Sequence, residues 1–135
     1  MKNNFIYTLA VLLTIAISIG ACSKGEKNPT LIVHVQERDG TVAGGATVRV
    51  WPGQNNTGGA LNEDDIDQTG TTNAAGDVTF KFGGSVVLDI DVIYYKTSDT
   101  LSTATDTLTG HRVVKLEAVR QVSDDNITNE TVEVR

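Results

Sequence analysis

LIVHVQERDGTVAGGATVRVW, residues 31–51, decides the fold class of this 135-residue chain. In its first segment Leu31, Val33 and Val35 share one face and Ile32, His34 and Gln36 the other, as in a strand that buries one face. Residues 38–40 read Arg-Asp-Gly, a turn sequence, and residues 46–51 resume the alternation with Thr47, Arg49 and Trp51 outward. This stretch therefore predicts two β-strands joined by a short connection.

The same alternation of inward and outward residues recurs to the end of the chain. We expect strands at 77–82, 86–95, 111–121 and 131–135, and a long polar loop from residue 54 to residue 70. The Thr-rich segment 98–110 is either a weak edge strand or a loop. Counting it gives seven strands, enough for an all-β, antiparallel β-sandwich with a shared core.

Two motifs resemble those of the transthyretin-like, carboxypeptidase regulatory-like family. The first comprises Asp39-Gly40, Gly45-Ala46 and Val48-Arg49-Val50, and the second runs from Thr72 through Asn73 and Gly76 to Phe80. Asn73 stands where the family usually has Asp, and both residues cap turns through a side-chain oxygen. The resemblance implies a prealbumin-like, Greek-key sandwich over residues 30–135, and its motifs specify turns and core faces rather than chemistry.

The N-terminal segment has the layout of a signal peptide. Lys2 precedes an apolar run from Phe5 to Ile19, which is shorter than the roughly 20 residues of a spanning helix and ends at small residues. Ile19-Gly20-Ala21-Cys22 resembles the lipobox of bacterial lipoproteins. We therefore expect a signal peptide at residues 1–21.

In that reading Cys22 is the lipidated first residue of the mature protein, although a buried or reactive free thiol is the alternative for a lone cysteine. Two or three acyl chains, palmitate among them, would anchor the chain firmly in a membrane. Ser23 follows the cysteine, and the absence of Asp there points to the outer membrane, on its periplasmic or its outward side. Residues 22–29 are then a lipidated cysteine and a short tether, whose seven residues after Cys22 reach at most about 25 Å.

The charge of the chain limits its partners. The formal net charge is −6, and removal of residues 1–21 would remove only the cation of Lys2. Nucleic acids are poor partners for such an acidic protein. We expect contact with the membrane through the lipid on Cys22, an outer-membrane protein as a candidate partner, and a glycan as an alternative one.

Trp51 and Tyr95 are the candidate ligand-binding residues. Both are predicted to point outward, and Trp51 directly precedes a Pro-Gly turn. An exposed Trp can stack on a sugar or anchor a protein partner, and it can equally fold over the end of the sandwich. Tyr95 and Ile93 form an apolar surface that needs a cover from a loop or a partner protein.

An acidic segment offers a candidate metal site. Hard cations such as Ca²⁺ bind several oxygens, and the segment supplies Glu63, Asp64, Asp65 and Asp67. Its spacing is not that of an EF-hand, so a solvated acidic loop is the competing interpretation.

The residues predict no catalytic site and no cofactor. Tyr94, Tyr95, His34 and His111 match in type the iron ligands of intradiol dioxygenases, but adjacent strand residues point to opposite faces. The chain also lacks the motif of a nucleophile elbow. Thr100 and Thr107 each follow Asp and precede Leu, a pattern used in some O-glycosylation systems, although chance matches are expected in so Thr-rich a segment.

These observations predict a non-catalytic, lipid-anchored binding or assembly module of the cell envelope. The resemblance suggests a TonB-dependent receptor as the partner, because related domains occur fused to such receptors. The alternative is a carbohydrate-binding accessory lipoprotein that uses Trp51 and the 54–70 loop.

Overall fold

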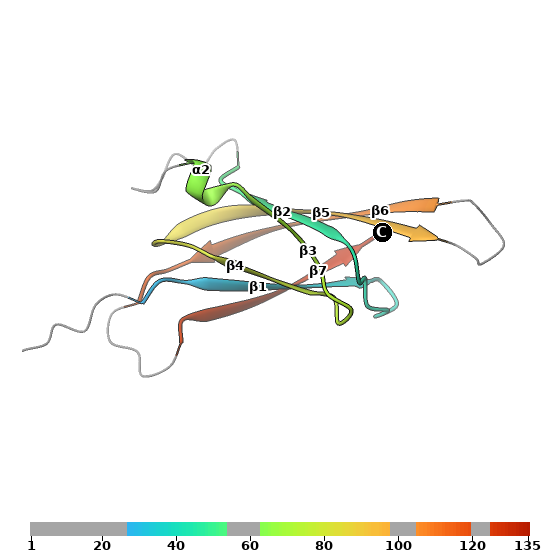
Figure 1. Ribbon diagram of the computed structural model, residues 1–135, viewed down its shortest axis with the longest axis horizontal. Coiled ribbons are helices and arrows are strands. Elements are labelled where there is room, and N and C mark those ends of the chain that lie inside the picture. Colours follow the sequence, from blue (N-terminus) through green and yellow to red (C-terminus); the bar gives the residue numbers. More distant parts are fainter. Residues whose placement is uncertain (1–26, 54–62, 98–104, 120–124) are drawn as a thin grey trace, which may run out of the picture.

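The computed structural model describes residues 27–53, 63–97, 105–119 and 125–135. These segments form seven strands and one short helix (Figure 1). The strands are β1 (Thr30–Glu37), β2 (Thr47–Trp51), β3 (Gln68–Thr71), β4 (Asp77–Lys81), β5 (Val86–Thr97), β6 (Thr105–Leu116) and β7 (Ile127–Val134), and the helix is α2 (Glu63–Ile66).

The strands form two packed sheets, in the orders β4-β1-β7 and β3-β2-β5-β6. This confirms the predicted all-β sandwich with seven strands. The strands pair antiparallel except at one pair, where β1 and β7 run parallel from Thr30 beside Ile127 to Glu37 beside Val134. The reason is topological: soon after β6 the chain lies beside the start of β1, where Lys27 N donates to Val119 O at 3.1 Å, so β7 sets out from the same end as β1.

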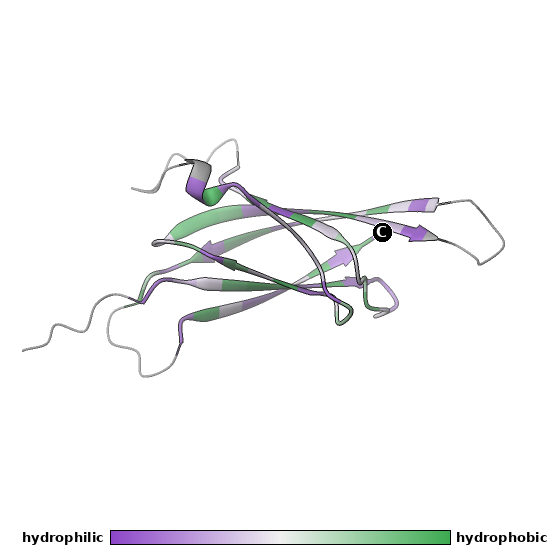
Figure 2. Ribbon diagram, in the orientation of Figure 1, coloured by the Kyte–Doolittle hydropathy of each residue, from purple (hydrophilic) through white to green (hydrophobic). Residues whose placement is uncertain are grey.

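The core lies between the sheets and consists of the inward residues of the alternating strands. Leu31, Val33, Val35, Val48 and Val50 are completely buried, as their alternation predicts. Hydrophobic colour recurs along the strands in Figure 2, and β5 becomes hydrophilic toward the tip of the β5–β6 hairpin. Burial of these apolar side chains is the main favourable term in folding.

The segment 54–70 is not the continuous loop that the sequence predicts. Residues 63–66 form one turn of helix, and Gln68–Thr71 is strand β3, which pairs with β2. The strand lacks an apolar alternation because its inward positions are Gln68 and Gly70. A Cβ at Gly70 would lie 2.8 Å from Val78 Cγ2 and 3.3 Å from the Phe80 ring, so side chains of β4 fill the space.

The C-terminal strands have other bounds than predicted, and the strand expected at 111–121 ends at Leu116. Thr105–Gly110 is neither a separate strand nor a loop but the first half of β6, whose twelve residues pair with all twelve of β5. Strand β7 begins at Ile127 rather than Thr131, because pairing with β1 extends its start. The seventh strand of the sandwich is therefore β3.

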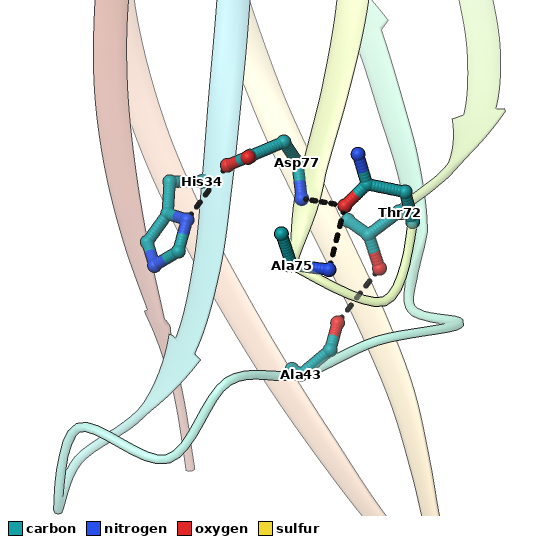
Figure 3. Close-up of polar contacts among 6 residues, drawn as sticks. His34, Ala43, Thr72, Ala75 and Asp77 are labelled. Atoms are coloured by element: carbon teal, nitrogen blue, oxygen red, sulfur yellow. Dashed lines mark hydrogen bonds and ion pairs between the residues drawn. The ribbon is translucent and has the colours of Figure 1, made fainter.

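The second motif, from Thr72 to Phe80, closes the turn between β3 and β4 (Figure 3). Asn73 Oδ1 accepts hydrogen bonds from Ala75 N and Asp77 N at 2.8 and 3.0 Å, which confirms its predicted capping role. Gly76 has φ = 80°, which a residue with a side chain rarely adopts. The buried Thr72 Oγ1 donates to Ala43 O at 2.7 Å and accepts from Ala46 N at 2.9 Å. The motif therefore ties the β3–β4 turn to the connection before β2.

No helix among the described residues is long and apolar enough to cross a membrane.

Candidate functional site

The outer face of the four-stranded sheet carries a row of charged side chains. The register places Arg49 of β2 opposite Asp91 of β5, and Asp91 opposite His111 of β6. Side chains directly opposite each other in antiparallel strands lie close enough to interact. Three residues from distant parts of the sequence therefore form one polar row.

Asp91 is the centre of this row because both of its carboxylate oxygens have a partner. Trp51 Nε1 donates to Asp91 Oδ2 at 2.6 Å, and His111 Nδ1 lies 2.8 Å from Asp91 Oδ1. The Arg49 guanidinium carbon lies 5.4 Å from the centre of the Trp51 ring, within the range of a cation–π interaction. The half-buried Trp51 is thus held on the sheet by a hydrogen bond and a cation.

A second carboxylate approaches His111 from the other side. Asp89 Oδ1 lies 3.6 Å from His111 Nε2. Gly53, with φ = 64°, leaves room for Asp89, because a Cβ at that glycine would lie 1.9 Å from Asp89 Oδ2. The Pro-Gly turn after β2 therefore lets this carboxylate lie against the backbone.

The other end of the row is an ion pair between Arg49 and Asp67. Arg49 Nε and Nη2 donate to the two oxygens of Asp67 at 2.9 and 2.6 Å, a bidentate geometry. The hydrogen bond and charge of Arg49 lower the pKa of Asp67, and those of Asp67 raise the pKa of Arg49. The charges of this half of the face are therefore mostly paired within the protein.

The half of the face beyond this row is neutral and exposes apolar side chains. Tyr95 is 62% exposed and Ile93 is 40% exposed, which confirms that both point outward. Their cross-strand neighbours on β6 are Thr107 and Thr109, both exposed. We call Ile93, Tyr95, Thr107 and Thr109 the hairpin patch.

A groove lies beside the hairpin patch, between β6 and β7. It has a volume of about 970 Å³, and its lining includes Thr109, Gly110 and His111 on one side and Thr131, Glu133 and Arg135 on the other. The strands touch at one end, where Thr109 and Arg135 exchange two backbone hydrogen bonds at 3.0 and 3.1 Å. Away from this contact they diverge (Figure 1).

Each of the two described histidines contacts a carboxylate on the protein surface. His34 Nδ1 contacts Asp77 Oδ1 at 2.7 Å on the outer face of the three-stranded sheet, far in topology from His111 (Figure 3). The two nitrogens of His111 face different carboxylates, so these groups do not converge on one point. Across the described segments, no three side chains of His, Cys, Asp or Glu are placed to hold a metal ion.

The predicted metal segment is divided between two elements. Glu63, Asp64 and Asp65 lie on α2, and Asp67 follows it. Asp67 would have to leave Arg49 to bind a cation, because both of its oxygens accept from that guanidinium. The calcium hypothesis for this segment stays a prediction.

Other predicted residues lie in part outside the described residues. These are Cys22 with the rest of the signal peptide and tether, Thr100, and most of the loop after Trp51. Thr107 is exposed on β6. Tyr94 packs against the core while Tyr95 is exposed, so the two tyrosines do point to opposite faces.

Sequence reasoning missed the row formed by Arg49, Asp91 and His111, as well as the groove. The outward direction of Asp89 and Asp91 follows from alternation, but their partners depend on which strands are neighbours. One signal could have found this row. A hairpin between the 86–97 strand and the Thr-rich segment predicts that His111 lies opposite Asp91. The groove has no signal in the sequence, because it depends on where β6 and β7 separate.

Comparisons with known proteins show no family for this chain. The sequence matches no known protein family and no curated protein. One similar solved structure is the dioxygenase domain of a dioxygenase carbohydrate-binding protein fusion from the cellulolytic bacterium Streptomyces sp. SirexAA-E. The identity is 15%, the alignment covers 85% of each chain, and the TM-score is 0.44. A likeness of this size carries no inference about fold, activity or ligand.

Proposed function

We propose that this chain is a lipid-anchored protein of the cell envelope whose β-sandwich binds a partner protein without catalysing a reaction. The hairpin patch is the observation that carries this proposal. Protein interfaces are enriched in Tyr and depleted of charge at their centres. Tyr95 and Ile93 are exposed in a neutral area, while the neighbouring charges are paired with one another.

The anchor rests on the sequence. Ile19-Gly20-Ala21-Cys22 ends an apolar run, and β1 begins only eight residues after Cys22. A domain held by so short a tether works close to the bilayer, which favours a membrane-resident partner. We therefore propose an outer-membrane protein as that partner and the outer membrane as the location, and we keep the transthyretin-like family as part of the proposal.

Carbohydrate binding at Trp51 ranks below protein binding. A sugar-stacking residue needs a free ring face, whereas the Trp51 ring has Arg49 over it and its Nε1 donates to Asp91. These contacts favour the role of a structural cover for the end of β2. A glycan array tests this ranking. Carbohydrate binding would rank first if the wild-type protein bound a sugar on the array and the Trp51→Ala variant did not.

The test of the proposal is site-specific photocrosslinking in intact cells. A photoreactive residue at Tyr95 should give a discrete crosslinked species in the membrane fraction. The matched control is the same residue at Thr79, which is exposed on the outer face of the other sheet. Failure to crosslink at Tyr95, or equal species from both positions, would contradict a specific partner at the hairpin patch.

Lipidation needs its own experiment. Cells fed a palmitate analogue should label the wild-type protein and should not label the Cys22→Ser variant. Equal labelling of the two proteins would show that Cys22 is not the acylated residue.

A further inference from the structure

The β5–β6 hairpin extends beyond the strands on both of its sides. Within the described residues, β2 pairs with β5 no further than Ile93, and the last bonds of β7 to β6 join Arg135 to Thr109. Ile93 and Thr109 lie opposite each other, so both neighbouring strands stop at the same pair. Four further pairs, which join residues 94–97 to residues 105–108, form a ribbon of two strands (Figure 1).

The edge of β6 in this ribbon directs backbone groups outward. Thr109 exchanges two backbone hydrogen bonds with Arg135, so its N–H and C=O point away from β5. Backbone direction alternates along a strand, so Thr105 and Thr107 also direct their N–H and C=O groups away from β5. In the part of the chain that the structure describes, these groups have no backbone partner. The edge of β6 therefore offers two donors and two acceptors to a further strand.

An edge of this kind is a site for strand addition. Many proteins bind peptides by adding an extended segment to an unpaired edge. A ribbon of two strands gains most from such a segment, because two strands alone are at best marginally stable in water. A segment beside Thr105 and Thr107 would continue the line of β7, since Arg135 occupies the preceding position along the edge. The segment would therefore bind without displacing β7 from Thr109.

The side chains along the edge indicate what kind of segment would fit. Thr107 is exposed on the outer face opposite Tyr95, so an added strand would extend the hairpin patch. Asp106 is exposed and points to the other face, where its cross-strand neighbour Lys96 already bonds to Glu37 at 2.7 Å. Among the residues that the structure describes, Asp106 has no ion-pair partner of its own. A segment with a cation opposite Asp106 would complement this charge.

We propose that the edge of β6 at Thr105 and Thr107 accepts an extended segment of the partner protein, which adds as a third strand to the ribbon. Antiparallel addition is favoured because its hydrogen bonds are slightly more stable per residue. The segment carries a cation opposite Asp106, and its residue opposite Thr107 lies beside the hairpin patch. This inference rests on the proposed protein-binding function and names where and how the partner binds.

The experiment uses a synthetic peptide of sequence Val-Ile-Lys-Val-Thr with blocked ends, added to the isotope-labelled mature protein. In antiparallel register its Ile, Lys and second Val would face Thr107, Asp106 and Thr105. We expect saturable NMR shifts of the Thr105 and Thr107 amides at millimolar peptide. A peptide with Glu in place of Lys would place a like charge opposite Asp106, so it should bind about threefold more weakly.

Two backbone changes to the peptide test the hydrogen bonds directly. N-methylation of its Ile, whose N–H faces Thr107, should weaken binding about fivefold. Methylation of its Lys, whose N–H faces away from β6, should change binding less than about twofold. In the protein, Thr107→Pro removes a donor from the free edge and leaves the bonds to β5, whereas Thr107→Val keeps that donor. Only the proline variant should lose the shift of the Thr105 amide.

The outcomes separate this inference from the proposed function. Where both hold, the Tyr95 crosslink in cells should be lost in Thr107→Pro and kept in Thr107→Val. No saturable shift of the Thr105 and Thr107 amides, or equal binding by the two methylated peptides, would overturn strand addition. If the Tyr95 crosslink then persists in Thr107→Pro, the partner binds in another way and the proposed function still stands. If the peptide binds as expected but Tyr95 gives no crosslink, the edge accepts a strand and the proposed cellular partner is wrong.

Discussion

Thr72 shows how one side chain can hold two segments of this sandwich together. Its side chain is 95% buried, and its hydroxyl bonds Ala43 O and Ala46 N, which lie on the connection before β2. Thr72→Val keeps the shape but leaves a buried donor and a buried acceptor unsatisfied. Since each such group costs about 1–3 kcal/mol, we expect the free energy of unfolding to fall by about 2–4 kcal/mol. Urea denaturation would measure this, and Thr72→Ser, which keeps the hydroxyl, should lose much less.

The Arg49–Asp67 pair makes a contribution to the stability of the fold that depends on pH in the acidic range. Because the folded-state pKa of Asp67 is lowered by Arg49, the pair stabilises the fold above the unfolded pKa of about 3.9. That contribution is lost as the pH falls through the lower, folded pKa. Arg49→Met should return the pKa of Asp67 toward its ordinary value, as measured by NMR titration of its carboxyl carbon. Arg112→Met, which removes a cation paired with Glu130 instead, should leave the titration of Asp67 unchanged.

At the scale of elements, the close approach of β6 to β7 depends on Gly110. A Cβ at this position would lie 2.7 Å from Glu133 O and 2.8 Å from Val132 Cγ1. Gly110→Ala must therefore push the strands apart, and overpacking of this kind costs about 1–3 kcal/mol. We expect a lower urea midpoint and faster hydrogen exchange at the Arg135 amide. The neighbouring Thr109→Ala removes only an exposed side chain, so a similar loss there would contradict this explanation.

Elements differ in how far their sequences predict them. Strands β1, β2 and β5 follow from alternation, because each has one face in the core and one in water. Strand β3 could not be predicted, since its inward residues are Gln68 and Gly70 and the space over Gly70 is filled by Val78 and Phe80 from β4. The sequence could not decide between strand and loop for the first half of β6. Its outward residues are threonines, and its pairing with β5 is not visible in its own residue pattern.

The candidate site shows the same limit. Alternation alone predicts that Trp51 and Tyr95 point outward, but it does not distinguish a ring held by Asp91 from a ring free in solvent. That difference depends on the register of β2 against β5, which places Trp51 opposite Asp89 and two register positions from Asp91. The direction of a side chain can therefore be predicted from the sequence, whereas its partner on a neighbouring strand can be identified only from the fold.

For the whole molecule, the position of the tether predicts an orientation at the membrane. The chain enters the sandwich at Lys27, and the hairpin patch lies toward the opposite end of β5 (Figure 1). The twelve residues of β5 span about 35–40 Å at roughly 3.3 Å per residue. A lipid on Cys22 would therefore place Asp125 near the bilayer and Thr107 away from it.

This orientation can be measured by energy transfer in vesicles that carry the lipidated protein. A donor dye on a cysteine introduced at Asp125 should transfer strongly to acceptor dyes on the lipid headgroups, and the same dye at Thr107 should transfer weakly. Both positions are exposed, so the labels should not disturb the core. Equal transfer from the two positions would mean that the sandwich lies flat on the membrane. In that case the hairpin patch would lie as close to the bilayer as the start of β7, and the orientation predicted from the tether would be wrong.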